Sequence, residues 1–137
     1  MSIEPIDLLG DVLDQLDSQR AVGTLTPDRH SSLSATAAQR AEHIATFEDM
    51  LHAAQESGLA YIGASFEPET GELFLRITEA RAGAWIARLT LSGYSFADPI
   101  STYRTAHGSA AEAVGPQGRR VVLQMNSRAE AVPAAAA

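Results

Sequence analysis

Three short β-rich runs between residues 59 and 91 constrain the fold of this chain more than any other feature. The first two runs, at 59–66 and 72–79, are separated by the segment from Pro68 to Gly71, which has the residue types of a tight turn. Two β-rich runs on either side of such a turn predict a β-hairpin.

The expected pairing of these runs collects apolar side chains on one face. We expect Glu67 to pair with Glu72, and Glu79 to pair with Trp85 of a third strand at 84–91. Side chains alternate along a strand, so both registers select the same side of the sheet. That inner face consists of Ile62, Ala64, Phe66, Leu73, Leu75, Ile77, Trp85, Leu89 and Leu91. The agreement of two separate registers predicts an antiparallel meander with helices over one side.

Two amphipathic helices are expected before this sheet. Residues 3–20 place leucines on one helical face and acids on the other. A second helix begins near Ser34 or Thr36, where a capping box is possible, and runs to Ser57. Gly58 then suits the left-handed conformation that ends many helices.

The remaining segments complete the expected architecture. Residues 21–34 and 92–118 are rich in Gly, Pro and Ser, which predicts loops, and 119–126 is a fourth strand. Residues 127–137 form an alanine-rich tail after a single α+β domain at 1–126. The expected order is αα-βββ-loop-β: two N-terminal helices, then a mostly antiparallel sheet of about four strands with helices covering one face.

The composition excludes several chemistries. The chain has no lysine and no cysteine, and all ten basic residues are arginines, so Schiff-base, thiol and thiolate-metal sites are excluded. The net charge of −7 disfavours direct nucleic-acid binding and anionic membranes. No apolar stretch approaches a membrane span, and the acidic N-terminus is unlike a secretory signal. We therefore expect a cytoplasmic protein, and the alanine-rich, lysine-free composition suggests a bacterial or phage origin.

An acidic line runs along the first predicted helix. Glu4, Asp7, Asp11 and Asp14 follow one another at spacings of three and four residues, which places them on one side of the helix. Such a line suits arginines of a basic protein partner. The ordinary alternative is a solvated helix face.

An arginine pair is expected on the outer face of the sheet. The predicted registers place Arg76 opposite Arg88, beside Gly63 and near Tyr61. Guanidinium groups bind carboxylate and phosphate in a bidentate manner, so the pair suits an anion. The alternative is that acidic side chains of this chain cover both arginines.

Aromatic residues gather in the second predicted loop. Tyr94, Phe96 and Tyr103 are residue types favoured at protein interfaces, so we expect them to bind a partner. If the chain is an enzyme, His107 would be the base and Asp98 would orient it. No catalytic motif supports this arrangement.

Histidine gives no metal site. His52 lies four residues after Glu48, which would be half of a site, but no second pair exists at helical spacing. We expect Glu48 and His52 to form a solvent-facing helix ion pair instead. We expect no metal and no cofactor.

These features favour a non-catalytic protein–protein interaction module. It would be a subunit of a bacterial or phage assembly, with homo-oligomerisation allowed, or a small acidic inhibitor or regulator of a basic partner. The alternative is a protein that binds a small anionic ligand, or a small enzyme, through the Arg76 and Arg88 face or the 94–107 loop.

Overall fold

The computed structural model describes residues 7–97, 99–115 and 120–127 and has an α+β fold with five strands rather than about four. The N-terminal part is helical, and a fourth helix and a 3-10 turn (η1, Glu79–Arg81) lie between the strands. The helices are α1 (Leu8–Ala21), α2 (Pro27–Gln39), α3 (Ala41–Glu56) and α4 (Ala82–Leu91). The strands are β1 (Gly63–Glu67), β2 (Glu72–Thr78), β3 (Tyr103–Thr105), β4 (Gly108–Val114) and β5 (Arg120–Asn126).

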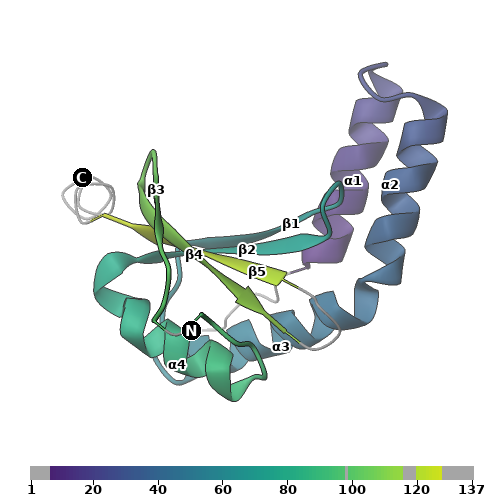
Figure 1. Cartoon of the computed structure of the whole chain (residues 1–137). Coiled ribbons are helices and arrows are strands. Elements are labelled where there is room, and N and C mark those ends of the chain that lie inside the picture. The colour runs from purple at the N-terminus through teal and green to yellow at the C-terminus, as the bar shows by residue number, and fades with distance from the viewer. Residues whose placement is uncertain (1–6, 98, 116–119, 128–137) are drawn as a thin grey trace, which may run out of the picture.

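The five strands form one mixed sheet in the order β1-β2-β5-β4-β3. β2 and β5 are parallel, and the other neighbours are antiparallel. Helices α3 and α4 lie on one side of this sheet (Figure 1). Helices α1 and α2 run antiparallel to each other and rise beside the end of the sheet; we call this pair the helical arm (Figure 1).

The predicted hairpin is confirmed, including its register. Glu67 pairs with Glu72, and Phe66 pairs with Leu73, as the alternation requires. Gly71 has a φ of 75° in the turn, where a residue with a Cβ would be strained. Ile62, however, precedes β1 and is 45% exposed, so it does not belong to the inner face.

The third predicted strand, 84–91, is wrong, because this segment is helix α4. Trp85 and Leu89 are fully buried, and their spacing of four residues puts both on one helical face. Leu91, which the strand register placed inside, is 86% exposed. The indole N–H of Trp85 donates to the carbonyl of Ala60 at 2.9 Å, which fixes α4 against the segment before β1.

The predicted loop at 21–34 is also wrong for residues 27–34, which belong to helix α2. Helix α2 begins at Pro27, and the hydroxyl of Thr26 accepts a hydrogen bond from the backbone N–H of Arg29 at 3.2 Å. Thr followed by Pro is therefore the N-cap and first position of a helix here, and not a loop signal.

The second predicted helix is divided into two. Arg40 leaves helical geometry with φ −99° and ψ 6°, which separates α2 from α3. Thr36 lies inside α2 and donates to the carbonyl of Ser32, so it caps nothing. The predicted end is confirmed, because Gly58 has a φ of 91° after α3 and Leu59 N–H bonds back to Ala54.

Two more strands lie inside the predicted loop at 92–118. β3 and β4 form a hairpin, and β4 then pairs with β5, the predicted fourth strand. Two alanines of β4, Ala111 and Ala113, are fully buried in the core. The predicted tail at 127–137 lies outside the described residues except for Ser127.

The core lies between the sheet and helices α3 and α4, and Leu8, Val12 and Ala37 extend it into the helical arm. It consists of buried apolar side chains, which cover one face of the sheet. Its largest fully buried side chains are Trp85, Phe47, Ile44, Leu51, Leu73, Leu75, Ile77, Leu89, Leu123 and Val121.

None of the described helices is both long and apolar enough to cross a membrane.

Candidate functional site

The face of the sheet turned away from α3 and α4 carries the first candidate site. Two cross-strand rows define it, and we call it the open face. One row is Gly63, Arg76, Gln124, Ala110 and Tyr103. The next row is Ser65, Phe74, Val122 and Glu112. Leu73, Leu75 and Ile77 alternate with Phe74 and Arg76 along β2, and they are buried in the core. Phe74 and Arg76 therefore point to the opposite side of the sheet, which is the open face.

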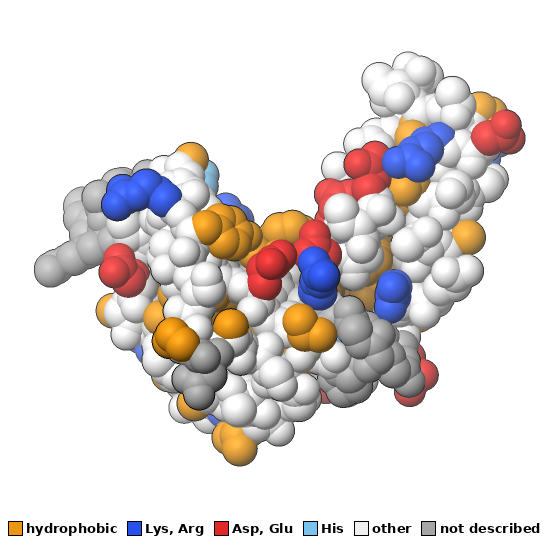
Figure 2. All heavy atoms as spheres, in the orientation of Figure 1, with side chains coloured by type: hydrophobic (Ala, Val, Ile, Leu, Met, Phe, Trp, Pro, Cys, Tyr) orange, Lys and Arg blue, Asp and Glu red, His pale blue; other side chains and the backbone are white. Residues whose placement is uncertain are grey.

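The open face is the floor of a hollow. Figure 2 shows the molecule hollowed between the helical arm and the β3–β4 hairpin, with hydrophobic and charged side chains inside the hollow. Part of it is a pocket of about 260 Å³. The pocket is lined by Gly63, Ala64, Ser65, Phe74, Arg76, His107 and Gln124.

Arg76 is the cationic group of this pocket. It is exposed, and the missing side chain of Gly63 makes room for it, since a Cβ there would lie 3.0 Å from Nη2 of Arg76. Within the described ranges no carboxylate forms a salt bridge with Arg76. The guanidinium is therefore available to an external carboxylate.

Gln124, the neighbour of Arg76 on β5, has hydrogen-bond partners within the chain. The amide nitrogen of Gln124 donates to the hydroxyl of Thr105 at 2.8 Å and to the carbonyl of Ser109 at 3.2 Å, which uses both of its protons. Farther along the row, Tyr103 is 49% exposed. Burial, with the charges of Glu112 and Glu72, raises its pKa, which agrees with its place beside these acids.

The predicted arginine pair does not form. Arg88 belongs to α4, on the helix-covered side, and its guanidinium donates to the hydroxyl of Ser57 at 3.0 Å. Tyr61 is half-buried and stacks edge-on against Trp85, with ring centroids 6.0 Å apart. Of the predicted anion set only Arg76 lies on the open face, so the pairing with Arg88 and Tyr61 is wrong.

One member of the predicted acidic line, Asp7, caps the N-terminus of α1. Glu4 lies outside the described residues, while Asp7, Asp11 and Asp14 are all exposed. The carboxylate of Asp7 accepts the backbone N–H of Gly10 at 2.9 Å, so it is the N-cap of α1. Asp11 and Asp14 keep the solvent-facing position that partner binding requires.

Glu48 shares the start of α1 with Asp7. Its carboxylate accepts the backbone N–H of Leu8 at 2.8 Å, from forty residues away along the chain. Burial raises the pKa of Glu48, the Leu8 N–H opposes that rise, and the charges of Asp7, Asp49 and Asp11 add to it. The predicted pairing of Glu48 with His52 is wrong, because His52 bonds to Glu56 at 2.8 Å.

The aromatic residues of the predicted 94–107 loop separate in space. Tyr94 is 5% exposed and Phe96 is half-buried against the core, so little of the Tyr94 ring is at the surface. The expected binding of a partner by these two residues stays a prediction. Tyr103 is on β3, at the open face. His107 lies at the β3–β4 turn, and Asp98 is outside the described residues, so the arrangement of these two as base and orienting acid stays a prediction.

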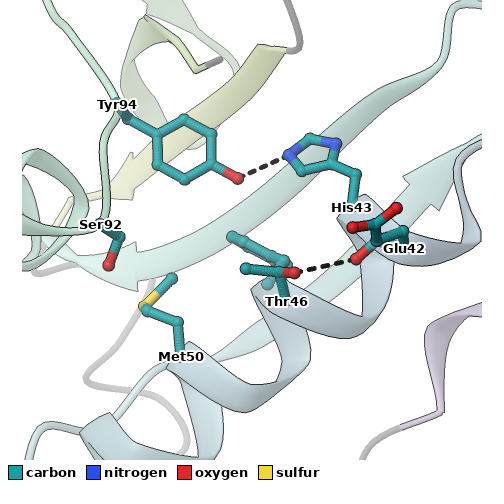
Figure 3. A pocket seen from close by; sticks show the side chains of 7 residues that line it. Glu42, His43, Thr46, Met50, Ser92 and Tyr94 are labelled. Atoms are coloured by element: carbon teal, nitrogen blue, oxygen red, sulfur yellow. Dashed lines mark hydrogen bonds between the residues drawn. The ribbon is translucent and has the colours of Figure 1, made fainter. Parts of the chain in front are cut away.

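A second candidate site lies between α3 and the end of α4. It is a cavity of about 360 Å³, which we call the α3 cavity (Figure 3). Its lining consists of Glu42, His43, Thr46, Phe47, Met50, Ser92 and Tyr94.

One wall of the α3 cavity is a buried hydrogen bond. The hydroxyl of Tyr94 lies 2.6 Å from Nε2 of His43, as the dashed line in Figure 3 shows. Gly93, with a φ of 97°, ends α4 and lets the N–H of Tyr94 bond back to Leu89 at 3.0 Å. This turn directs Tyr94 toward α3, so the local end of one helix completes a site on another.

The α3 cavity was not predicted from the sequence. His43 lies four residues before Phe47, on a buried face of α3, and that spacing was the one signal for it. Tyr94 was singled out as an interface residue and not as a cavity residue. Among the residues with a described structure, no group of three or more metal-ligating side chains gathers at this or any other place.

Searches against protein-family models, curated proteins and solved structures find no match to this chain. The geometry of the two sites is therefore the basis for any functional argument.

Proposed function

We propose that this chain is a non-catalytic protein-interaction module that binds a segment of a partner protein on the open face of its sheet. The supporting observation is Arg76, an arginine in a hollow with no carboxylate partner in the described parts of the chain. Phe74 lines the same pocket, and the exposed Tyr103 ends the same row of the sheet.

These side chains define the chemistry of the bound segment. A guanidinium binds a carboxylate through two parallel hydrogen bonds, which fixes direction as well as charge. Phe74, two residues from Arg76 on β2, and Tyr103, at the β3 end of the row, offer apolar and aromatic area on the same face. The fitting segment therefore carries an Asp or Glu next to an apolar side chain.

The open face suits a protein segment better than a free anion. An exposed ion pair contributes at most about 1 kcal/mol, which gives weak binding when it acts alone. Apolar contact adds roughly 25 cal/mol per Å² of area removed from water, so a segment that also covers Phe74 and Tyr103 binds much more tightly. The hollow reaches from the helical arm to the β3–β4 hairpin and leaves room for such a segment (Figure 2).

The exposed Asp11 and Asp14 of α1, with the net charge of −7, suit a basic region of the same partner. We propose a cytoplasmic bacterial or phage protein that acts either as a subunit of a larger assembly or as an inhibitor. Size-exclusion chromatography with light scattering distinguishes the two, because a subunit self-associates.

A phage-displayed library of random twelve-residue peptides tests the open face. We expect peptides enriched on the immobilised protein to share an acidic residue beside an apolar one. Arg76→Ala should weaken those peptides by about tenfold or more, since the bound segment shields the ion pair from water and a charge-assisted hydrogen bond then contributes about 1.5–3 kcal/mol. Phe74→Ala should weaken them several-fold, because it removes apolar contact area. Arg88→Ala is the matched control, because it removes an arginine from the opposite side of the sheet and should leave binding unchanged.

Three results would contradict the proposal. The first is a library that yields no binder. The second is a set of peptides whose affinity does not change with Arg76→Ala. The third is acetate alone competing as strongly as the peptides, since the site would then take a free anion and not a protein segment.

A further inference from the structure

We infer that the α3 cavity binds a small amphiphilic amine, a molecule with an apolar body and a protonated amino group. This inference does not depend on the open face, because the cavity is lined by α3 and the end of α4, on the helix-covered side. Three properties of the lining carry it: its apolar floor, the kind of polar atoms it offers, and its charge.

The floor of the cavity is apolar. Phe47 is almost completely buried, and Met50 is partly buried against the core beside it. A cavity of about 360 Å³ is within the range of pockets that enclose small organic molecules, roughly 300–1,000 Å³. The floor therefore accepts a ring or a short alkyl chain.

The hydroxyl groups of the cavity act as acceptors. The hydroxyl of Thr46 donates its proton to the carbonyl of Glu42 at 3.0 Å, as Figure 3 shows. The hydroxyl of Ser92 donates its proton to the carbonyl of Arg88 at 3.0 Å. Each hydroxyl has one proton and two lone pairs, so both oxygens have only acceptor capacity left for a ligand. A ligand that donates hydrogen bonds matches them.

The charge of the cavity selects an amine over an anion. Glu42 lines the cavity and is exposed, and no salt bridge to it occurs in the described part of the chain. A carboxylate is an acceptor with a negative charge, so it attracts an ammonium group with its three donors and repels a second carboxylate. The overall charge of −7 acts in the same direction.

The wall formed by His43 and Tyr94 keeps this cavity in shape. Their hydrogen bond of 2.6 Å is buried, and the glycine turn before Tyr94 fixes the position of its ring. A cavity whose lining is already ordered loses little conformational entropy on binding. The site is therefore preformed for a ligand of the right size.

Two matched sets of probes test the inference by isothermal titration calorimetry on the intact chain. One set is tryptamine, tryptophol and indole-3-acetate; the other is hexylamine, hexanol and hexanoate. Within each set the apolar body is similar and the headgroup is cationic, neutral or anionic. We expect at least one amine to bind at least tenfold more tightly than its matched carboxylate, with the alcohol between them.

Two variants locate the headgroup. Glu42→Gln should weaken the bound amine several-fold and leave the matched alcohol unchanged, because it removes charge and keeps shape. Thr46→Val should weaken both, because it removes an acceptor that either donor uses. Glu56→Gln, on an exposed site of the same helix, is the control and should change neither.

The inference is overturned if neither amine binds, or if the carboxylates bind as tightly as the amines. It is also overturned if Glu56→Gln weakens the amine as much as Glu42→Gln does, because the attraction would then belong to the acidic protein as a whole.

Discussion

Glu48 connects α3 to the first turn of α1 through its hydrogen bond to Leu8. The N–H groups of a helix start have no partner within the helix, so this carboxylate and that of Asp7 divide the role of capping α1 between them. The arrangement brings carboxylates together, since Asp7, Asp11 and Asp49 all act on Glu48. Glu48 therefore stabilises the start of α1, but its ionised form is repelled by the neighbouring acids, and this repulsion depends on pH.

The sign of that dependence follows from the raised pKa of Glu48. Burial and the neighbouring acids penalise its ionised form, so the folded protein binds the proton more tightly than the unfolded chain does. The penalty is fully present above the raised pKa and is lost as the pH falls through the range just above the ordinary value of 4.5.

Glu48→Gln should therefore raise the thermal midpoint relative to the wild type more at pH 7 than at pH 4.5. The amide oxygen of Gln still accepts the Leu8 N–H, while the charge is absent at both pH values. Differential scanning fluorimetry at the two pH values measures this difference directly. A difference in midpoint that stays constant with pH would contradict the explanation.

Single residues were predictable where a local rule fixes their position. Arg76 was expected on the outer face beside Gly63, and strand alternation with a confirmed register places it there. Asp7 and Tyr94 were expected to bind a partner, which stays a prediction; the sequence analysis did not foresee that Asp7 caps α1 or that Tyr94 follows the glycine turn at the end of α4. Arg88 was misplaced because its predicted strand is a helix.

At the scale of elements, the segment at 82–91 shows why periodicity alone did not decide its structure. Trp85 and Leu89 are four residues apart, a spacing that fits the same face of a strand and of a helix. Only Ala87 and Leu91, both exposed, distinguish the two patterns, and alanine is apolar enough to fit either. Its high helix propensity, and Gly93 as a stop, were the better indicators.

The strands differed in how much the sequence revealed. The β1–β2 hairpin was predictable because its turn residues and alternation are local. Strand β4 (Gly108–Val114) was missed because alanine, serine and glycine give little hydrophobic alternation. The parallel pairing of β2 with β5 joins segments separated by more than forty residues, and no local pattern specifies such a contact.

Two glycines outside the tightly packed regions test the element boundaries. Gly83 is inside α4 with no atom near its missing Cβ, so Gly83→Ala should stabilise the protein by about 0.5–1 kcal/mol. Gly58 has equal space but a φ of 91°, so Gly58→Ala should destabilise it by about 1–2 kcal/mol. Urea denaturation of both variants measures the pair. Changes of the same sign would show that α4 or the end of α3 is misplaced.

At the scale of the whole molecule, the helical arm is less embedded than the helices under the sheet. α2 buries two of its thirteen residues, Leu33 and Ala37, whereas α3 buries five of its sixteen. An exposed ion pair from Arg29 to Glu69 at 3.0 Å and a hydrogen bond between His30 and Asp17 at 2.6 Å also hold α2. Exposed ion pairs contribute little, so the arm depends on few apolar contacts.

Hydrogen exchange followed by mass spectrometry should therefore show two rates. Backbone amides of α2 should exchange faster than those of β5, which is hydrogen-bonded on both sides and nearly all buried. α3 should exchange more slowly than α2, although both are helices of similar length. Equal protection of α2 and β5 would mean that the arm and the sheet open only together.

The position of β5 at the centre of the sheet has a consequence for synthesis on the ribosome. β2 and β4 both pair with β5, yet β5 is the last of the described strands to be translated. Until residue 126 has left the exit tunnel, β2 and β4 each have one edge without a neighbouring strand. Their buried apolar side chains cannot yet form one continuous face of a sheet. Helices α1 to α3 can form before β5 emerges, but the sheet is completed only once β5 is outside the tunnel. The nascent chain therefore passes through a stage in which the unpaired edges of β2 and β4 are exposed at the same time.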